Sequence, residues 1–361
     1  MTTNPIESLR ARLSRIKNRY DAHFAGQPRH TRDPGMLEDM VREIDEIIAA
    51  SNGLEVGLEQ TVLESLNQDR TLYQNEILAI REIQSAAPGV LLAHEYQTWV
   101  WLIIGRYRRN FAGRSRSSRD LGMLHEMADE LKVLDGKLAT LFDRTQATPI
   151  PRIREDIKES LELYQTEVKA IVDARSSGSR EEQASRLAGA ANAQFDQYRQ
   201  HFSGKSRLSR DIRLMERIIS QVTDIGEQMV GLRNDGFASE NNDGNIDIVA
   251  NRKSFYVGEL SLIRDARQNT TFDQLVTSLG EAANAIFDEY RAHFGGQDRM
   301  TRELDRLNHC CEGLYYLARQ MNDLDDVREH DVNQENLATV LDHLRIYDRE
   351  HQAIAEAQSG S

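Results

Sequence analysis

One short motif occurs four times in the chain, and it limits the fold more than any other feature. Its pattern is Y-x-x-[HN]-F-x-G-x-x-R-x-[ST]-R-[DE], and the copies begin at Tyr20, Tyr107, Tyr198 and Tyr290. Five positions are identical in every copy, and successive first tyrosines lie 87, 91 and 92 residues apart. Repetition at a nearly fixed period is typical of tandem structural units.

A second pattern, Y-x-x-E-x-x-x-I, recurs in the same register. Its copies begin at Tyr73, Tyr164, Tyr256 and Tyr347, which follow the first tyrosine of each unit by 53, 57, 58 and 57 residues. Two independent landmarks that keep register indicate duplication of one ancestral unit. We therefore expect four homologous units at residues 5–86, 88–177, 180–268 and 270–358.

Each unit is expected to contain three helices. Apolar residues before the first motif are spaced by four and three residues, as on one helix face, for example Leu9, Leu13 and Ile16. The motif glycine suits the left-handed position that ends a helix. The acidic residue that ends the motif suits the N-cap of the second helix. The fourth unit has Glu303 there, a poorer cap, so Thr301 is expected to cap that helix instead.

The predicted fold is all-α: a tandem array of four homologous three-helix bundles, about twelve helices in total. The connections between units are short, so successive units are expected to touch. In general form such an array resembles spectrin-like repeats, which are also consecutive three-helix units. The units here are shorter and carry the loop motif G-x-x-R-x-[ST]-R, so the resemblance concerns architecture and implies no function.

Composition narrows the function classes. The 361 residues include 58 acidic and 45 basic side chains, a formal net charge of −13. This balance argues against broad nucleic-acid binding, which needs a clustered basic surface. No apolar run approaches the roughly 20 residues of a membrane span, and the first residues show no secretion signal. We expect a cytoplasmic protein that binds neither nucleic acid nor membrane.

The two arginines of each motif allow two interpretations. Beside a helix N-terminus they suit a phosphate or carboxylate ligand, which would make the chain an anion-binding protein. Alternatively, one arginine bonds the glutamate of the third helix and holds the bundle closed as a clasp. We prefer the clasp, because recurring polar pairs in repeat proteins are usually architectural. The arginines are Arg29, Arg32, Arg116, Arg119, Arg207, Arg210, Arg299 and Arg302, and the glutamates are Glu76, Glu167, Glu259 and Glu350.

Two tryptophans in the second unit depart from the repeat. Trp99 and Trp101 occupy positions outside the shared core face. Two residues turn about 200° around a helix, so the two rings point in nearly opposite directions. Both cannot enter the core of their own unit. They pack against a neighbouring unit, or they form a surface for a protein partner or a second copy of the chain, with Trp101 and Ile104 as anchors.

The sequence shows no catalytic constellation. Phosphate-loop, dinucleotide and nucleophile-elbow motifs are absent, and the histidines lack metal-ligand spacing. Cys310 and Cys311 align with apolar positions of the other units and are interpreted as core residues. We expect no enzyme, cofactor or metal site. The leading hypothesis is a non-enzymatic scaffold or adaptor; the alternatives are anion binding by the arginine loops and an enzyme site between units.

Overall fold

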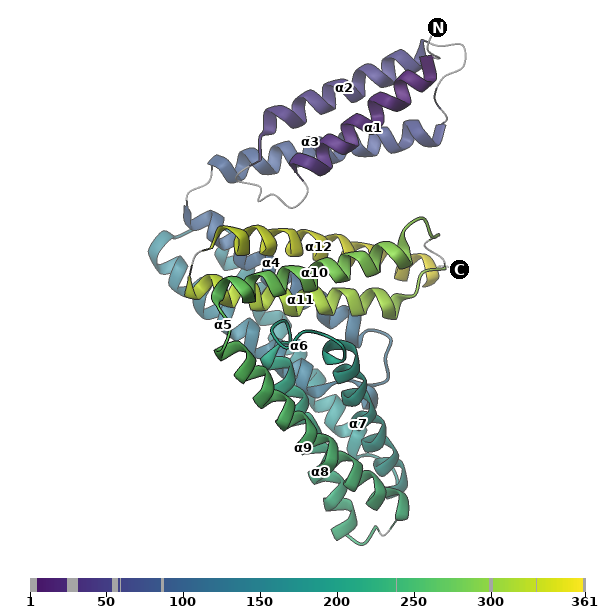
Figure 1. Cartoon of the computed structure of the whole chain (residues 1–361), viewed down its shortest axis with the longest axis vertical. Helices are drawn as coiled ribbons and strands as arrows, with labels where there is room; N and C mark the ends of the chain where they lie inside the picture. The colour runs from purple at the N-terminus through teal and green to yellow at the C-terminus, as the bar shows by residue number, and fades with distance from the viewer. Residues whose placement is uncertain are drawn as a thin grey trace. The chain divides into compact units, whose positions relative to one another are not determined.

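The computed structural model describes residues 5–24, 32–53, 58, 60–85, 88–237, 239–298, 301–328 and 330–359. Among them every regular element is helical and no strand occurs, which confirms the all-α class (Figure 1). None of these helices combines the length and the apolarity that a membrane span needs. The helices are α1 (Pro5–His23), α2 (Pro34–Asn52), α3 (Gln60–Ser85), α4 (Pro88–Phe111), the 3₁₀ helix η2 (Arg116–Ser118), α5 (Leu121–Thr145), α6 (Ile150–Ser176), α7 (Arg180–Phe202), α8 (Ile212–Asn234), α9 (Glu240–Gln268), α10 (Phe272–Phe294), α11 (Leu304–Val327) and α12 (Asp331–Ser359).

By its contacts the chain divides into two compact parts, which we call the smaller unit (Met1–Leu92) and the larger unit (Ala93–Ser361). The names first to fourth unit stay with the four predicted repeats. In the smaller unit α2 packs against both α1 and α3. The core face of α2 carries four fully buried apolar side chains spaced by three, four and three residues: Leu37, Met40, Ile44 and Ile47. Division of the whole chain into four homologous units stays a prediction.

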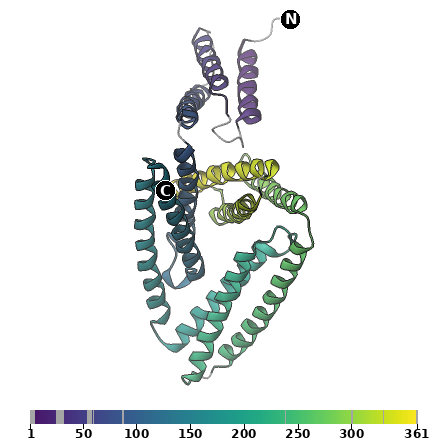
Figure 2. The same ribbon diagram turned by 90° about the vertical axis from the view of Figure 1, so that its left-hand side faces the viewer.

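In the larger unit, consecutive helices pack side by side. Contacts join α5 to α6, α7 to α8, α8 to α9, α10 to α11 and α11 to α12, and further contacts join α5 to α8 and α6 to α7. Helices α10 to α12 run across the direction of α8 and α9 (Figures 1 and 2). Every residue of α11 from 310 to 321 is buried. Polar side chains on this helix therefore need partners inside the protein.

The loops after the first helices adopt the predicted glycine conformation. Gly113, Gly204 and Gly296 have φ angles of 71°, 72° and 73°, in the left-handed region. This confirms the prediction for three units, whereas Gly26 of the first unit lies outside the described residues.

The second helices begin at the acidic residue that ends the motif. The carboxylates of Asp33, Asp120 and Asp211 accept backbone N–H groups in the first turns of α2, α5 and α8. The fourth unit differs from the expectation. Glu303 remains the N-cap of α11, without a side-chain bond, and Thr301 instead donates its hydroxyl to the Asp298 carbonyl. Thr301 as the cap was therefore wrong, because its hydroxyl closes the loop.

Candidate functional site

The two repeated tyrosines of each unit stack on each other. The ring centroids are 4.9 Å apart for Tyr20–Tyr73, 5.0 Å for Tyr107–Tyr164, 4.5 Å for Tyr198–Tyr256 and 3.9 Å for Tyr290–Tyr347. Each first tyrosine also lies beside the motif phenylalanine one turn later, which is buried in all four copies. The stacks join the end of the first helix to the third helix.

The last arginine of each motif pairs with the glutamate of the third helix. In the first unit Arg32 Nη1 lies 2.6 Å from Glu76 Oε1, and both side chains are buried. The structure thus brings together the residues predicted to form the clasp, and their role in holding each bundle closed stays a prediction. The four pairs are Arg32–Glu76, Arg119–Glu167, Arg210–Glu259 and Arg302–Glu350.

The other arginine of the motif reaches the same glutamate from solvent. Arg116 Nε lies 3.7 Å from Glu167 Oε1, and Arg207 Nη2 lies 3.1 Å from Glu259 Oε1. Both arginine side chains are exposed. Two guanidinium groups facing one carboxylate leave one local positive charge. The corresponding arginines of the first and fourth units, Arg29 and Arg299, lie outside the described residues.

A further recurring contact was missed by the sequence analysis. A side chain eleven residues after the second tyrosine donates to the backbone carbonyl of the clasp arginine. The donors are Arg175, Arg267 and Gln358, at 2.5, 2.8 and 3.0 Å from the carbonyls of Arg119, Arg210 and Arg302. Comparing polar positions of the third helices in register would have revealed them. In these three units the loop is thus tied to the third helix both by the clasp side chains and by a backbone carbonyl.

The two tryptophans have different surroundings. Trp99 lies edge-to-face on Tyr315 of α11, with ring centroids 6.1 Å apart. Trp101 is 57% exposed, and Ile104 is half-buried. Trp99 therefore packs against a helix of the predicted fourth unit, while Trp101 lies on the outer face of α4.

A buried network of charges surrounds Arg106, which has no exposed surface. Arg106 Nε lies 3.1 Å from Glu312 Oε2, and its Nη2 donates to the Tyr316 hydroxyl at 2.9 Å. Its guanidinium also lies 4.0 Å from the centre of the Tyr315 ring. On the same helix, Arg109 donates to Glu312 at 3.3 Å. Two arginines of α4 are thus held by one face of α11.

The same network extends to α5 and α8. Arg319 of α11 bonds Glu126 and Glu130 of α5 at 2.5 and 2.7 Å, and it bonds Asp211 at the start of α8 at 2.8 Å. Arg217 of α8 bonds Glu126 at 2.5 Å. These contacts connect helices that the sequence assigned to three different units. The network therefore lies between helices of different predicted units.

The network keeps the carboxylates of Glu126 and Glu312 ionised. Burial opposes the charge on Glu126, but Arg217, Arg319 and Arg106 outweigh it and hold the pKa of its carboxyl below the ordinary value. Burial also raises the pKa of Glu312, but the positive charges of Arg106 and Arg109 outweigh burial and lower this pKa below its ordinary value. Glu312 is buried and Glu126 is largely so, and each arginine has a carboxylate partner. The arrangement suits a rigid joint better than proton transfer to a substrate.

A cavity of about 430 Å³ lies between the α7–α8 loop and helices α10 and α11. Its lining includes His201, His309, Lys205 and Asp211. The rings of His201 and His309 lie 5.0 Å apart, which the sequence could not show because the two residues come from different units. Burial lowers the pKa of His201, and His309 and Lys205 lower it further. The imidazole is therefore neutral in the folded chain at neutral pH.

This neutral pair predicts a loss of stability on mild acidification. The unfolded chain binds a proton at His201 near the ordinary pKa of 6.5, whereas the folded chain does not, so stability falls as the pH drops below that value. His201→Asn, which copies Asn110 of the second unit, should reduce this loss between about pH 7 and about pH 5. Urea unfolding at both values measures it, with exposed His125→Asn as the control. An unchanged loss in His201→Asn would contradict the prediction.

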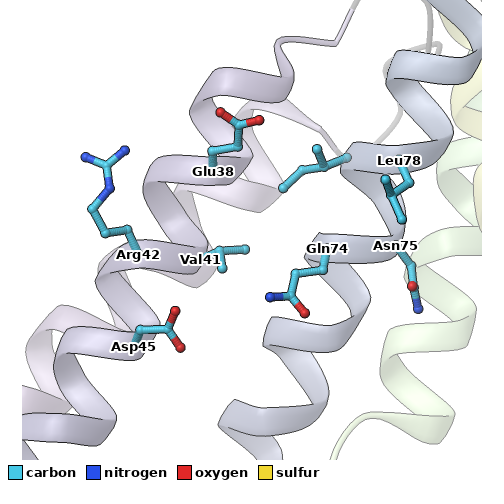
Figure 3. Close-up of a pocket in the computed structure, with 8 residues that line it drawn as sticks. Glu38, Val41, Arg42, Asp45, Gln74, Asn75 and Leu78 are labelled. Carbon is cyan, nitrogen blue, oxygen red and sulfur yellow. The ribbon is translucent and has the colours of Figure 1, made fainter.

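A second hollow is open and lies in the smaller unit, between α2 and α3. Glu38, Arg42 and Asp45 line it from α2, and Gln74 and Leu78 line it from α3 (Figure 3). The charged groups are engaged elsewhere: Glu38 pairs with Arg81, Arg42 with Asp39, and Asp45 with Arg70. They do not converge on one point, as a binding site for a small ligand requires.

The adjacent cysteines are buried within α11. Burial raises the pKa of both the Cys310 and the Cys311 thiols to about 12, so neither forms a thiolate at neutral pH. Their predicted place in the core is confirmed. Among the residues that the structure describes, no three His, Cys, Asp or Glu side chains are grouped as metal ligands would be.

Comparisons with profiles of protein families, with curated protein sequences and with solved structures find no match for this chain.

Proposed function

We propose that the chain is a non-enzymatic scaffold or adaptor, which presents a rigid helical surface to a protein partner or to a second copy of itself. The proposed architecture is a tandem array of four homologous three-helix bundles. Tyrosine stacks and clasp ion pairs at the same register positions of all four sequence units support it. Arrays of this kind offer extended surfaces on which partners dock.

Rigidity in this proposal comes from the buried network. Isolated bundles on short linkers would still rotate against one another. The bonds of Arg106 and Arg319 tie α4, α5 and α8 to α11. Breaking such bonds would leave unpaired charges inside the protein, which is costly. A scaffold built in this way keeps a fixed spacing between its surface sites.

The observation that carries the proposal is the exposure of Trp101. Its neighbours Val100 and Leu102 are buried, whereas the indole of Trp101 is 57% exposed. Tryptophan is the side chain most enriched at binding hot spots, because it buries a large rigid surface with one polar group. Trp99 packs against Tyr315 inside the protein, whereas Trp101 is accessible to a partner. The half-buried Ile104 lies three residues further along the same helix.

Trp101→Ser, which copies the residue of the first unit, should leave the free energy of unfolding within about 0.5 kcal/mol of the native value. The matched variant Trp99→Ser removes the contact with Tyr315 and should cost about 2 kcal/mol or more. Urea denaturation compares the two. Binding of partners, or self-association measured by sedimentation, should be weakened by Trp101→Ser. A destabilised Trp101→Ser that retains every partner would place this side chain in the packing and overturn the proposal.

A further inference from the structure

One exposed apolar position recurs in every unit. Thirteen large apolar residues among those described are exposed, and four of them occupy the same place, immediately before the second repeated tyrosine. They are 47% to 54% exposed. No other register position of the third helices has an exposed large apolar residue in more than one unit within the described chain. The four residues are Leu72, Leu163, Phe255 and Ile346.

Recurrence separates this position from ordinary surface exposure. Single exposed apolar residues are normal on any protein and need no explanation. Two residues further along, on the other side of the buried tyrosine, Val257 of the third unit is as exposed as Phe255, but the other units have Gln74, Gln165 and Asp348 there. The core of each unit uses the following tyrosine, which is buried in all four copies. An apolar residue that is kept in four copies without being buried indicates a use outside the unit.

The clasp lies one helical turn away on the same face. Phe255 precedes Glu259 by four residues, so their Cβ atoms are about 6 Å apart. Glu259 holds Arg210 and the exposed Arg207, which leaves a net positive charge beside the apolar side chain. The second unit repeats this arrangement with Leu163, Glu167, Arg119 and Arg116. In the second and third units the site therefore offers an apolar contact next to an exposed guanidinium group.

We infer that this position is a repeated docking site for a protein segment that carries apolar side chains next to carboxylates. The paired arginines at Glu167 and Glu259 favour an acidic segment at these two positions. Several equal sites on one chain suit a partner with repeated segments, since linked sites raise the overall affinity. This inference rests on the proposed scaffold function but uses residues other than Trp101.

A pair of labelled peptides tests the inference. The probe is a helical peptide of about 18 residues, with leucines at seven-residue spacing and glutamates one turn from each leucine. Its counterpart has lysines in place of the glutamates. The full-length chain should bind the glutamate peptide, measured by fluorescence anisotropy, and bind the lysine peptide more weakly. Adding salt should weaken the glutamate complex.

Five variants identify the site. Leu163→Ser and Phe255→Ser together should lower the affinity for the glutamate peptide roughly tenfold, since each removes an apolar contact that the bound peptide would cover. Val257→Ser, equally exposed on the same helix, and Trp101→Ser should leave the affinity unchanged. Circular dichroism checks folding. Phe255 contacts the ring of Tyr198, so its replacement also removes a contact within the unit. Leu163→Ser and Ile346→Ser are therefore also measured singly.

Several outcomes would overturn the inference. The inference fails if neither peptide binds, if the chain prefers the lysine peptide, or if Val257→Ser lowers the affinity for the glutamate peptide as much as the double variant does. A dimer in sedimentation that Phe255→Ser abolishes would make a second copy the occupant. If Trp101→Ser alone abolished peptide binding, the inference would fail while the proposed scaffold function would stand.

Discussion

Replacing Arg106 by methionine is expected to lower the free energy of unfolding of the larger unit by about 3–5 kcal/mol. Methionine fills much of the same space but leaves the buried carboxylates of Glu312 and Glu126 short of a cation. Chemical denaturation followed by tryptophan fluorescence measures the change. Both tryptophans belong to the larger unit, and Trp99 touches α11, so the signal reports on the region of the network.

Arg108→Met is the matched control, because Arg108 lies on the same helix with an exposed side chain. It should change stability by less than about 1 kcal/mol. The double variant Arg106→Met/Glu312→Leu should cost less than the sum of its single variants, because Glu312 no longer remains as an unpaired charge. Equal effects of Arg106→Met and Arg108→Met would show that the network does not hold the larger unit together.

Arg32→Ala and Glu76→Ala are each expected to destabilise the smaller unit by about 3 kcal/mol. The two side chains are buried and 2.6 Å apart, so either variant removes a close opposite charge from the one that remains inside the protein. The double variant should cost clearly less than the sum. Urea unfolding followed by circular dichroism measures all three, because the smaller unit contains no tryptophan.

The control for this cycle is Arg42→Ala on the second helix of the same unit. Arg42 is exposed and pairs with Asp39 three residues away, so its loss should be nearly neutral. Strictly additive losses for Arg32→Ala and Glu76→Ala would mean that the two residues do not interact, and the clasp interpretation would then fail.

Local sequence patterns predicted what depends on local geometry. The helical class follows from apolar spacing, and the glycine and aspartate positions follow from the backbone needs of helix ends. The pairing of Arg32 with Glu76 was also foreseeable, because two landmarks in constant register placed both residues at one end of a bundle. Repetition supplied that information, since one copy alone would not have distinguished the motif from chance.

The buried network could not be predicted in this way. Three of its members on α11 align with Arg42, Asp45 and Ala49 of the first unit, and the repeat pattern predicts surface positions for them. They are Glu312, Tyr315 and Arg319. Periodicity along a helix identifies its core face within one bundle but does not say which bundle packs on its other face. Trp99 shows the same limit: its position excluded its own core, and only the structure identified Tyr315 as its neighbour.

The most direct test of the scaffold proposal is affinity capture from a lysate of the source cell, with the native chain beside Trp101→Ser and Trp99→Ser, read by mass spectrometry. The proposal predicts at least one protein, or added copies of the chain itself, that the native chain captures and Trp101→Ser loses while its melting temperature is unchanged. Identical captures by the native chain and by a fully folded Trp101→Ser would contradict it.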